Sequence, residues 1–235
     1  MFAPRLVSTV FALGALSACA SQKDAAVTTA ASGGGLAATS ATATPAPTPL
    51  TDFRTTEAPV LTHHVQLTFP DRFSKAGESY FSPDDRTIVF QAIEKPIGDA
   101  APSEFYSMYV ADVVRGADGR ISAIANIKRI SPEGSANTCG WFHPKHPEIL
   151  IFGSTIVPPS NKETPGYQRG TGKYRWQFPP EMRIVQVNLR TADGTASSLK
   201  TLVGDGNGYA AECSFSPDGR TLLYTEVDPK IRISG

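Results

Sequence analysis

The sequence has no surplus charge of either sign, and it has few cysteines. Its 22 lysine and arginine residues balance 22 aspartate and glutamate residues, and only three cysteines occur among 235 residues. A balanced chain presents no extended positive field to a nucleic acid or to an anionic membrane surface. The composition therefore argues against nucleic acid as a partner and against membrane binding through a basic patch.

Signatures of several catalytic and ligand-binding sites are also missing. No G-x-S-x-G occurs, so the strand-to-helix turn that presents a catalytic serine is absent from the sequence. In Gly166–Lys173 (GYQRGTGK) the first glycine lies one residue too far from the lysine for a phosphate-binding loop, and Tyr174 replaces the magnesium-binding Ser or Thr. His143 and His146 flank a proline turn without a group of further ligands nearby, which is too few donors for zinc. We expect neither a cofactor nor a metal.

Glycine and proline are abundant, with 20 and 19 residues, and the apolar positions show little helical periodicity. This composition favours an all-β chain with many turns. One strand–turn–strand pattern occurs three times, as ESYFSPDDRTIVFQA at 78–92, CGWFHPKHPEILIFGST at 139–155 and AECSFSPDGRTLLYTEV at 211–227. In each copy an aromatic residue is followed by one residue and then by proline, which favours a chain reversal between two apolar runs. An internal repeat is the strongest fold signal that a sequence offers.

Further β-prone runs lie between the three copies. A third strand is expected after each turn, at 108–113, 184–189 and 231–234. Short strands are expected before each copy, at 63–69, 127–131 and 199–203. Each unit then has an inner, a second, a third and an outer strand, which is one four-stranded antiparallel blade of a β-propeller. The expected blades lie near 76–131, 137–203 and 210–235, and strand 63–69 would complete a blade supplied by another part of the ring.

The turn sequence itself is informative. Phe-Ser-Pro-Asp, then Asp or Gly, then Arg-Thr and an apolar run, occurs at 81–90 and 215–224. It resembles the WD-like repeat of TolB-family periplasmic proteins, and also the repeat of tricorn-type and prolyl-oligopeptidase-type propellers. The resemblance covers roughly 63–235, although the middle copy has His143-Pro144-Lys145 in its turn. It implies a propeller, usually of about six or seven blades.

The chain accounts for only about three blades, an incomplete ring. A piece of a longer protein is the interpretation that we favour, and closure of the ring between chains is the alternative. A β-sandwich with coincidental turns is a third interpretation. TolB itself also carries an N-terminal α/β domain, for which a low-complexity segment stands here, so the partners of TolB do not transfer directly.

The N-terminus has the pattern of an export signal. Arg5 precedes an apolar stretch at 6–16 that is too short to span a bilayer, and Leu16–Cys19 (LSAC) resembles a bacterial lipobox. The resemblance implies that residues 1–18 are removed and that Cys19 is lipidated. An ordinary secretory signal with a chance cysteine is the alternative. Residues 19–60 are rich in Ala, Thr, Ser and Pro, and we expect them to form a disordered tether. Localisation would then be the bacterial envelope, with an outer-membrane anchor facing the periplasm.

Three residues are candidates for lining a central channel. Counted back three places from the aromatic of each copy, they are Glu78, Cys139 and Glu212. Two carboxylates at equivalent points of inner strands are suited to bind a cation or an amine. Alternatively, each glutamate accepts hydrogen bonds from the backbone of a neighbouring blade. Cys139 and Cys213 differ by one register position, so we expect two buried thiols rather than a disulfide.

The long connection at 156–181 is a candidate binding loop, because connections of this length are usually functional or disordered. Its aromatic and arginine residues are of the types that dominate binding surfaces. The candidates are Tyr167, Arg169, Tyr174, Arg175 and Trp176. Alternatively, the loop folds over the blade edge and buries Trp176 and Phe178.

These observations favour a non-catalytic scaffold. Its TolB-like propeller would bind an envelope protein or a cell-wall component, and a lipid on Cys19 would attach it to the membrane. The alternative from another class is the propeller of an exported prolyl-oligopeptidase-type hydrolase, with a catalytic domain beyond residue 235. A sensor that holds a small ligand at Glu78 and Glu212 is a third hypothesis.

Overall fold

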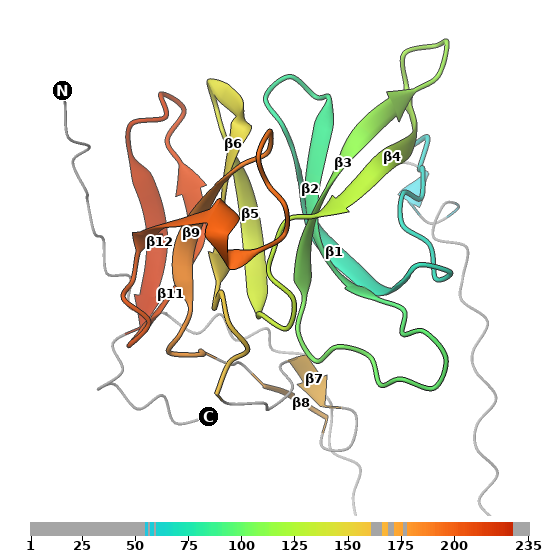
Figure 1. The fold of residues 1–235 in the computed structure, drawn as a ribbon. Coiled ribbons are helices and arrows are strands. Elements are labelled where there is room, and N and C mark those ends of the chain that lie inside the picture. Colours follow the sequence, from blue (N-terminus) through green and yellow to red (C-terminus); the bar gives the residue numbers. More distant parts are fainter. Residues whose placement is uncertain are drawn as a thin grey trace, which may run out of the picture. The chain divides into compact units, whose positions relative to one another are not determined.

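The computed structural model describes residues 55, 57–58, 60–160, 166–168, 172–175 and 178–227. The chain divides into two units, one of residues 12–64 and one of residues 1–11 with 65–235. In the described part of the first unit, the carbonyl of Glu57 accepts the backbone N–H groups of Val60 and Leu61 at 2.8 and 2.7 Å. All strands of the described residues belong to the second unit (Figure 1).

The described residues form antiparallel sheets and almost no helix. The first sheet has the order β1 (Phe73–Phe81), β2 (Thr87–Glu94), β3 (Ser107–Arg115), β4 (Ile121–Arg129). The second sheet has the order β10 (Leu199–Val203), β9 (Arg183–Asn188), β6 (His146–Ser154), β5 (Asn137–His143). The third sheet pairs β11 (Tyr209–Phe215) with β12 (Leu222–Val227), and a small hairpin pairs β7 (Gly166–Gln168) with β8 (Lys173–Arg175). A single 3-10 turn, η1 (Ala196–Ser198), precedes β10 among these residues.

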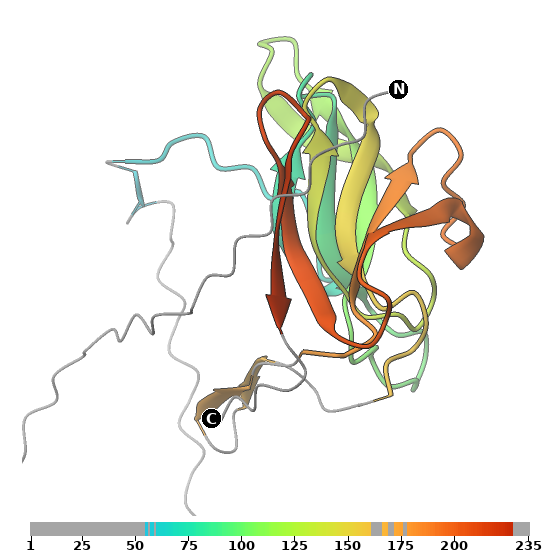
Figure 2. The same cartoon turned by 90° about the vertical axis from the view of Figure 1, so that its left-hand side faces the viewer.

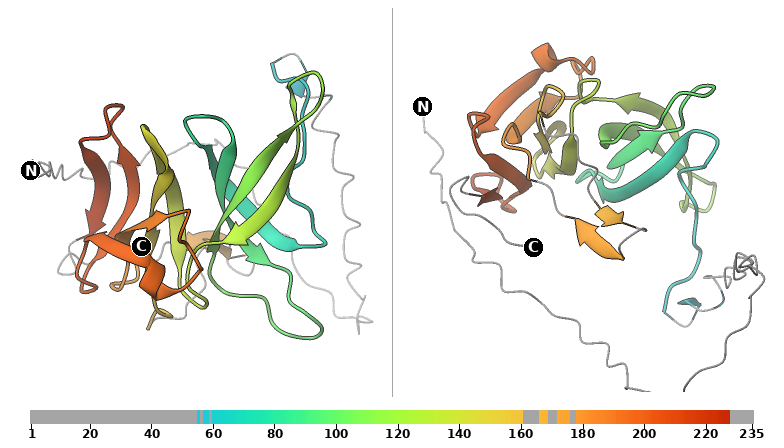
Figure 3. Two further views of the ribbon diagram at one scale, coloured as in Figure 1. Left: turned by 45° about the horizontal axis from the view of Figure 1, so that its top comes forward. Right: turned by 90° about the horizontal axis from the view of Figure 1, so that it is seen from below.

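The all-β prediction and the four-stranded antiparallel units are confirmed. The three sheets follow one another side by side in chain order, and no closed barrel or ring occurs within the described ranges (Figures 1 and 3). The strand expected at 199–203 is β10 with those bounds, while the strand expected at 127–131 forms earlier, as β4. The strand expected at 231–234 lies outside the described residues, so the third sheet is described as two strands.

The strand predicted at 63–69 is wrong. These residues have no strand structure, and His63 has φ 60°, which interrupts an extended run. A strand persists only if its backbone groups pair with a neighbour, and the blade that this one was expected to join is not among the described sheets. Leu67 packs instead against a cluster on the first sheet that contains Phe73, Phe90 and Tyr109.

The two Ser-Pro-Asp turns fold in the same way. In the first, the Ser82 hydroxyl donates to Asp84 at 2.6 Å and accepts the N–H of Thr87 at 2.9 Å. In the third sheet, Ser216 makes the corresponding contacts with Asp218 at 2.6 Å and with Thr221 at 3.0 Å. The sequence pattern therefore specifies the turn through side-chain caps of its own backbone.

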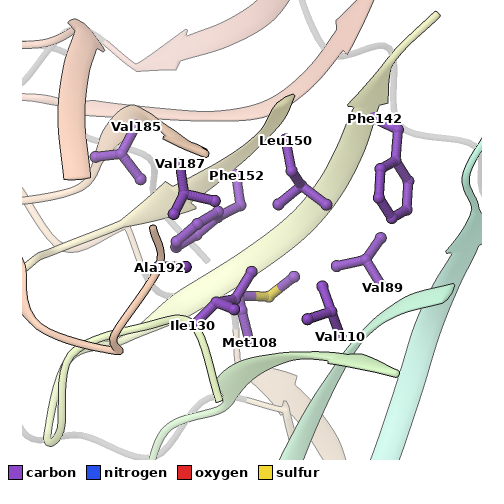
Figure 4. Packing of buried hydrophobic residues seen from close by; sticks show 10 residues of the cluster. All are labelled: Val89, Met108, Val110, Ile130, Phe142, Leu150, Phe152, Val185, Val187 and Ala192. Carbon is purple, nitrogen blue, oxygen red and sulfur yellow. The ribbon is translucent and has the colours of Figure 1, made fainter. Parts of the chain in front are cut away.

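The main core lies between the first and second sheets. Figure 4 shows Val89, Met108 and Val110 of the first sheet packed against apolar side chains of the second, which include Phe142, Leu150, Phe152, Val185 and Val187. A second interface, between the second and third sheets, contains Ile151, Ile184, Ala210 and Cys213. The second sheet thus buries both of its faces, one against each neighbouring sheet.

Candidate functional site

A β-bulge occurs at the same place in the first strand of each sheet. The register shifts between Gly77 and Tyr80 in β1, between Thr138 and Trp141 in β5, and between Ala211 and Ser214 in β11. The first residues of these bulges are Glu78, Cys139 and Glu212, with φ of 45°, 48° and 54°. Positive φ is costly for any residue with a side chain, and such outliers gather at functional positions.

The bulges bring the three predicted residues together. β5 lies between β1 and β11, and the Cys139 sulfur is 3.1 Å from Oε2 of Glu78 and 2.8 Å from Oε2 of Glu212. Glu78 and Glu212 are exposed, and Cys139 is half-buried. The partner that the two glutamates share is therefore the thiol, rather than the backbone of a neighbouring sheet. We name these three residues the Glu–Cys–Glu cluster.

The cluster has more hydrogen-bond acceptors than donors. One thiol carries one proton and can donate to only one carboxylate at a time. The Thr138 hydroxyl also lies 3.2 Å from the sulfur and donates to it. Neither carboxylate forms an ion pair with a lysine or arginine within the described ranges. The arrangement is therefore suited to a cation or to a group with several N–H donors.

Two tyrosines border the cluster. Burial raises the pKa of Tyr209, and the charge of Glu212 raises it further. Burial also raises the pKa of Tyr80, with smaller effects of Cys139, Glu78 and Glu212 in the same direction. Both phenols therefore stay protonated at neutral pH and place hydroxyl groups at the edge of the site.

Cys139 is not suited to act as a nucleophile. Burial raises the pKa of its thiol well above the usual range, and the hydrogen bond to Glu212 adds to the rise. The thiol is thus protonated at physiological pH, whereas reactive cysteines have a lowered pKa. The geometry favours binding over covalent chemistry at this position.

Another acceptor lies close by. Gln91 of β2 pairs with Gly77, the residue before Glu78, and its side chain is buried. Gln91 and Val89 share one face of β2, which is the face toward the second sheet. Within the described part of the chain the Oε1 atom of Gln91 has no hydrogen-bond partner. The surroundings of the Glu–Cys–Glu cluster are therefore short of donors as well.

Cys213 has a different environment from Cys139. It is the second bulge residue in β11, it is buried, and its sulfur lies 3.9 Å from the carbonyl oxygen of Cys139. Burial raises the pKa of Cys213 to about 12. Both thiols are free, as the register predicted, but the expectation that both are buried holds for Cys213 alone, because Cys139 is half-buried. Cys19 lies outside the described residues.

The predicted binding loop is described only in part. Tyr167 belongs to β7, and Tyr174 and Arg175 belong to β8, while Arg169 and Trp176 lie outside the described residues. Phe178 is half-buried and packs edge-on against Tyr209, with ring centroids 5.0 Å apart. One end of the loop is thus anchored beside the Glu–Cys–Glu cluster.

The histidine pair of the middle turn makes structural contacts. His143 and His146 have ring centroids 4.8 Å apart, and His143 packs against Phe215 of the third sheet at the same distance. The Nδ1 atom of His143 accepts the backbone N–H of Lys145 at 3.1 Å. No group of three or more His, Cys, Asp or Glu able to hold a metal occurs in the described part of the chain.

Sequence reasoning missed Thr138, Tyr80 and Tyr209 as members of the site. Each lies within three residues of a predicted member, so position alone was a usable signal once the repeats were aligned. The bulges gave no such signal, because Glu and Cys occupy positions where Gly or Asn is usual.

No helix among the described residues has the length and apolar character needed to cross a membrane. Comparison with protein-family models, with curated proteins and with solved structures found no match to this chain. The resemblance to TolB-type repeats therefore stays a prediction.

Proposed function

We propose that this chain is a lipid-anchored, TolB-like propeller of the bacterial envelope that acts as a non-catalytic scaffold and binds an envelope protein or a cell-wall component. The observation that carries the proposal is the convergence of Glu78, Cys139 and Glu212 from equivalent bulges of three sheets. In a propeller the first strands of the blades surround the central axis, so equivalent positions on these strands lie close together.

The propeller arrangement is supported by the repeated way in which the sheets pack. The second strand of one sheet packs against the first strand of the next, with Val89 against Gly140 and Ile151 in one cluster with Cys213. Such a repeat adds sheets one after another, and each new sheet covers the face that the previous one leaves open.

A binding role is supported by the chemistry of the Glu–Cys–Glu cluster. Two exposed carboxylates without a basic partner in the described chain can accept several hydrogen bonds from one ammonium or guanidinium group. Lysine and arginine side chains of a protein, or the free amines of cell-wall peptides, present such groups. The protonated thiol argues against a nucleophilic reaction at the same place.

The anchor is supported by the lipobox-like sequence that ends at Cys19. The intact mass of the protein extracted from native envelopes tests it. We expect a chain that begins at Cys19 and carries acyl groups, whereas a product without acyl groups would contradict the anchor and leave the binding proposal standing.

Photo-cross-linking in native envelopes tests the binding role. A photoreactive amino acid at position 78 or 212 is expected to form an adduct with an envelope protein or a cell-wall peptide. Glu133 is the matched control, because it is a glutamate whose side chain is 86% exposed and forms a surface ion pair.

The adduct at position 78 should weaken when Glu212 is also replaced by Gln, because Glu212 is then the one carboxylate of the Glu–Cys–Glu cluster left to hold the donor group. Equal adduct yields at positions 78, 212 and 133 would contradict the proposed binding site.

A further inference from the structure

Two aromatic side chains contact each other beside the Glu–Cys–Glu cluster. Tyr80 follows Glu78 by two residues, and Trp141 follows Cys139 by two residues. The ring centroids of Tyr80 and Trp141 are 4.9 Å apart, so this pair joins β1 to β5 as the contact between Glu78 and Cys139 does. β5 lies between β1 and β11, and Figure 2 shows the sheets from the side of β11 and β12. The aromatic pair therefore lies two residues along the same strands from the cluster.

The aromatic pair is close enough to the carboxylates to share a ligand with them. Burial is the main cause of the raised pKa of Tyr80, and electrostatic effects of the three cluster members add to it, which only nearby groups exert. Tyr80 and Trp141 are both half-buried, so part of each side chain stays exposed. Exposed aromatic surface next to two carboxylates favours a cation with a flat face, because such a group interacts with the rings and with the carboxylates together.

A buried acceptor without a partner is directed to the same place. Gln91 is only 7% exposed, and its Oε1 atom has no hydrogen-bond partner within the described residues. It pairs with the residue before Glu78 and shares a face of β2 with Val89, which lies against Gly140 of β5. Because Gly140 follows Cys139, the Gln91 side chain points toward β5 at the level of the Glu–Cys–Glu cluster. A buried acceptor is costly until a donor reaches it.

The site thus combines many acceptors with an aromatic surface. Its two carboxylates form no ion pair with a lysine or arginine in the described part of the chain. A guanidinium group has five N–H donors in one plane, stays charged at physiological pH, and can bind a carboxylate through two parallel hydrogen bonds. An ammonium group has three donors around a point charge and no flat face. The acceptors and the rings together therefore match a guanidinium group better than an ammonium group.

We infer that the Glu–Cys–Glu cluster binds a guanidinium group, the side chain of an arginine on a protein partner. The N–H groups of this arginine donate to Glu78, Glu212 and Gln91, and its plane stacks on the rings of Tyr80 and Trp141. Arginine recognition rests on the proposed binding role and narrows it, because the free amines of cell-wall peptides carry no guanidinium. The partner is then an envelope protein with an exposed arginine.

Titration of the full chain with three small probes tests this preference. The probes are Nα-acetyl-arginine amide, Nα-acetyl-lysine amide and Nα-acetyl-citrulline amide, and citrulline has nearly the shape of arginine without its charge. We expect the arginine probe to bind about tenfold more tightly than the lysine probe, because stacking on the rings adds to the charge interaction. The citrulline probe should not bind measurably. Isothermal titration calorimetry measures the three affinities.

Two variants separate the ring and the buried acceptor from the charge of the cluster. Trp141→Leu and Gln91→Leu should each weaken binding of the arginine probe about fivefold and change that of the lysine probe by less than about twofold. Gln91→Leu should fold normally, because the oxygen that it removes has no partner in the described chain. The matched control is Phe69→Leu, since Phe69 is an exposed aromatic residue that precedes the first strand.

Equal affinities for the arginine and lysine probes would overturn arginine recognition and leave the proposed binding role intact. The same holds if the citrulline probe binds as tightly as the arginine probe, or if Trp141→Leu and Gln91→Leu keep the full preference for arginine. Circular dichroism checks that each variant folds, and Gln91→Leu decides alone if Trp141→Leu does not. If neither cationic probe binds the native chain, the cation-binding role of the cluster is wrong as well.

Discussion

Oε2 of Glu212 lies 2.8 Å from the sulfur of Cys139, and both residues occupy the first position of a bulge in neighbouring strands. The contact joins the second and third sheets, and both residues have a positive φ, which is unfavourable for residues with a side chain. The same sulfur meets Glu78 of the first sheet. One thiol thus links all three sheets at their first strands.

The first prediction concerns the reactivity of this thiol. After burial, the contact with Glu212 is the largest cause of the raised pKa of Cys139, so Glu212→Gln should lower that pKa. Alkylation of Cys139 by iodoacetamide at pH 8 should then accelerate by roughly threefold per pKa unit, because a tenfold gain in thiolate is partly offset by the lower nucleophilicity of a less basic thiolate. Peptide mass spectrometry separates Cys139 from the buried Cys213.

Two variants serve as controls for that measurement. Thr138→Val removes a contact that lowers the pKa of Cys139, so it should slow alkylation. Glu226→Gln changes an exposed glutamate of the same sheet and should have no effect. Equal rates in the native and Glu212→Gln chains would show that the carboxylate does not act on the thiol.

The second prediction concerns the close approach of the first two sheets. A Cβ atom at Gly140 would lie 2.7 Å from Val89 and 2.8 Å from Met108, so Gly140→Ala overpacks the core. We expect it to reduce the free energy of unfolding by about 1–3 kcal/mol in urea titrations. Gly77→Ala is the control, because its Cβ would meet nothing within 4 Å. Equal stability of the two variants would contradict the packing described.

The third prediction concerns backbone strain at the bulges. Glu212 has φ 54°, a region that glycine adopts freely and alanine does not. Glu212→Gly should therefore be more stable than Glu212→Ala by about 1 kcal/mol, and both lack the carboxylate. The comparison uses urea unfolding at neutral pH. If Glu212→Ala were more stable than Glu212→Gly, the backbone at position 212 would not be strained.

The fourth prediction concerns His143. Burial lowers its pKa most, and the neighbouring His146 lowers it further; the backbone of Gly219 opposes these effects, and Lys145 and Glu148 have smaller effects in opposite directions. A base with a lowered folded pKa binds fewer protons in the folded state than in the unfolded state. Its contribution to stability is present above the unfolded pKa, near 6.5, and is lost as the pH falls through the folded value.

Thermal unfolding between pH 5 and pH 8 checks this prediction. The melting temperature of the native chain should fall more steeply below pH 6.5 than that of His143→Gln. The control is His63→Gln, because His63 lies in the other unit and its only described hydrogen bond is to Thr62. Parallel pH profiles for the native chain and His143→Gln would refute the role assigned to His143.

The hairpins and the site could be predicted from the sequence because local chemistry specifies them. The Ser-Pro-Asp turns cap their own backbone, so the reversals at Ser82 and Ser216 follow from a few adjacent residues. Alignment on the aromatics then placed Glu78, Cys139 and Glu212 at equivalent points, and the structure brings these residues into contact.

The features that the sequence did not predict depend on contacts between residues distant in the sequence. The run 63–69 has strand-like alternation, but alternation cannot supply the neighbour that a strand requires, and the run stays irregular. The bulges could not be predicted because Glu78 and Cys139 do not favour positive φ. The packing of neighbouring sheets imposes this backbone conformation. The same holds for Gln91, whose unpaired oxygen no sequence pattern reveals.

Cation binding by the Glu–Cys–Glu cluster can be measured by titrating the chain with Nα-acetyl-lysine amide and following the NMR signals of the Glu78 and Glu212 carboxylates. We expect both signals to shift together and to saturate, with affinity about tenfold weaker in Glu78→Gln and in Glu212→Gln and unchanged in Glu133→Gln. Shifts that are absent, or that are equally strong in all three variants, would contradict a cation-binding role for the Glu–Cys–Glu cluster.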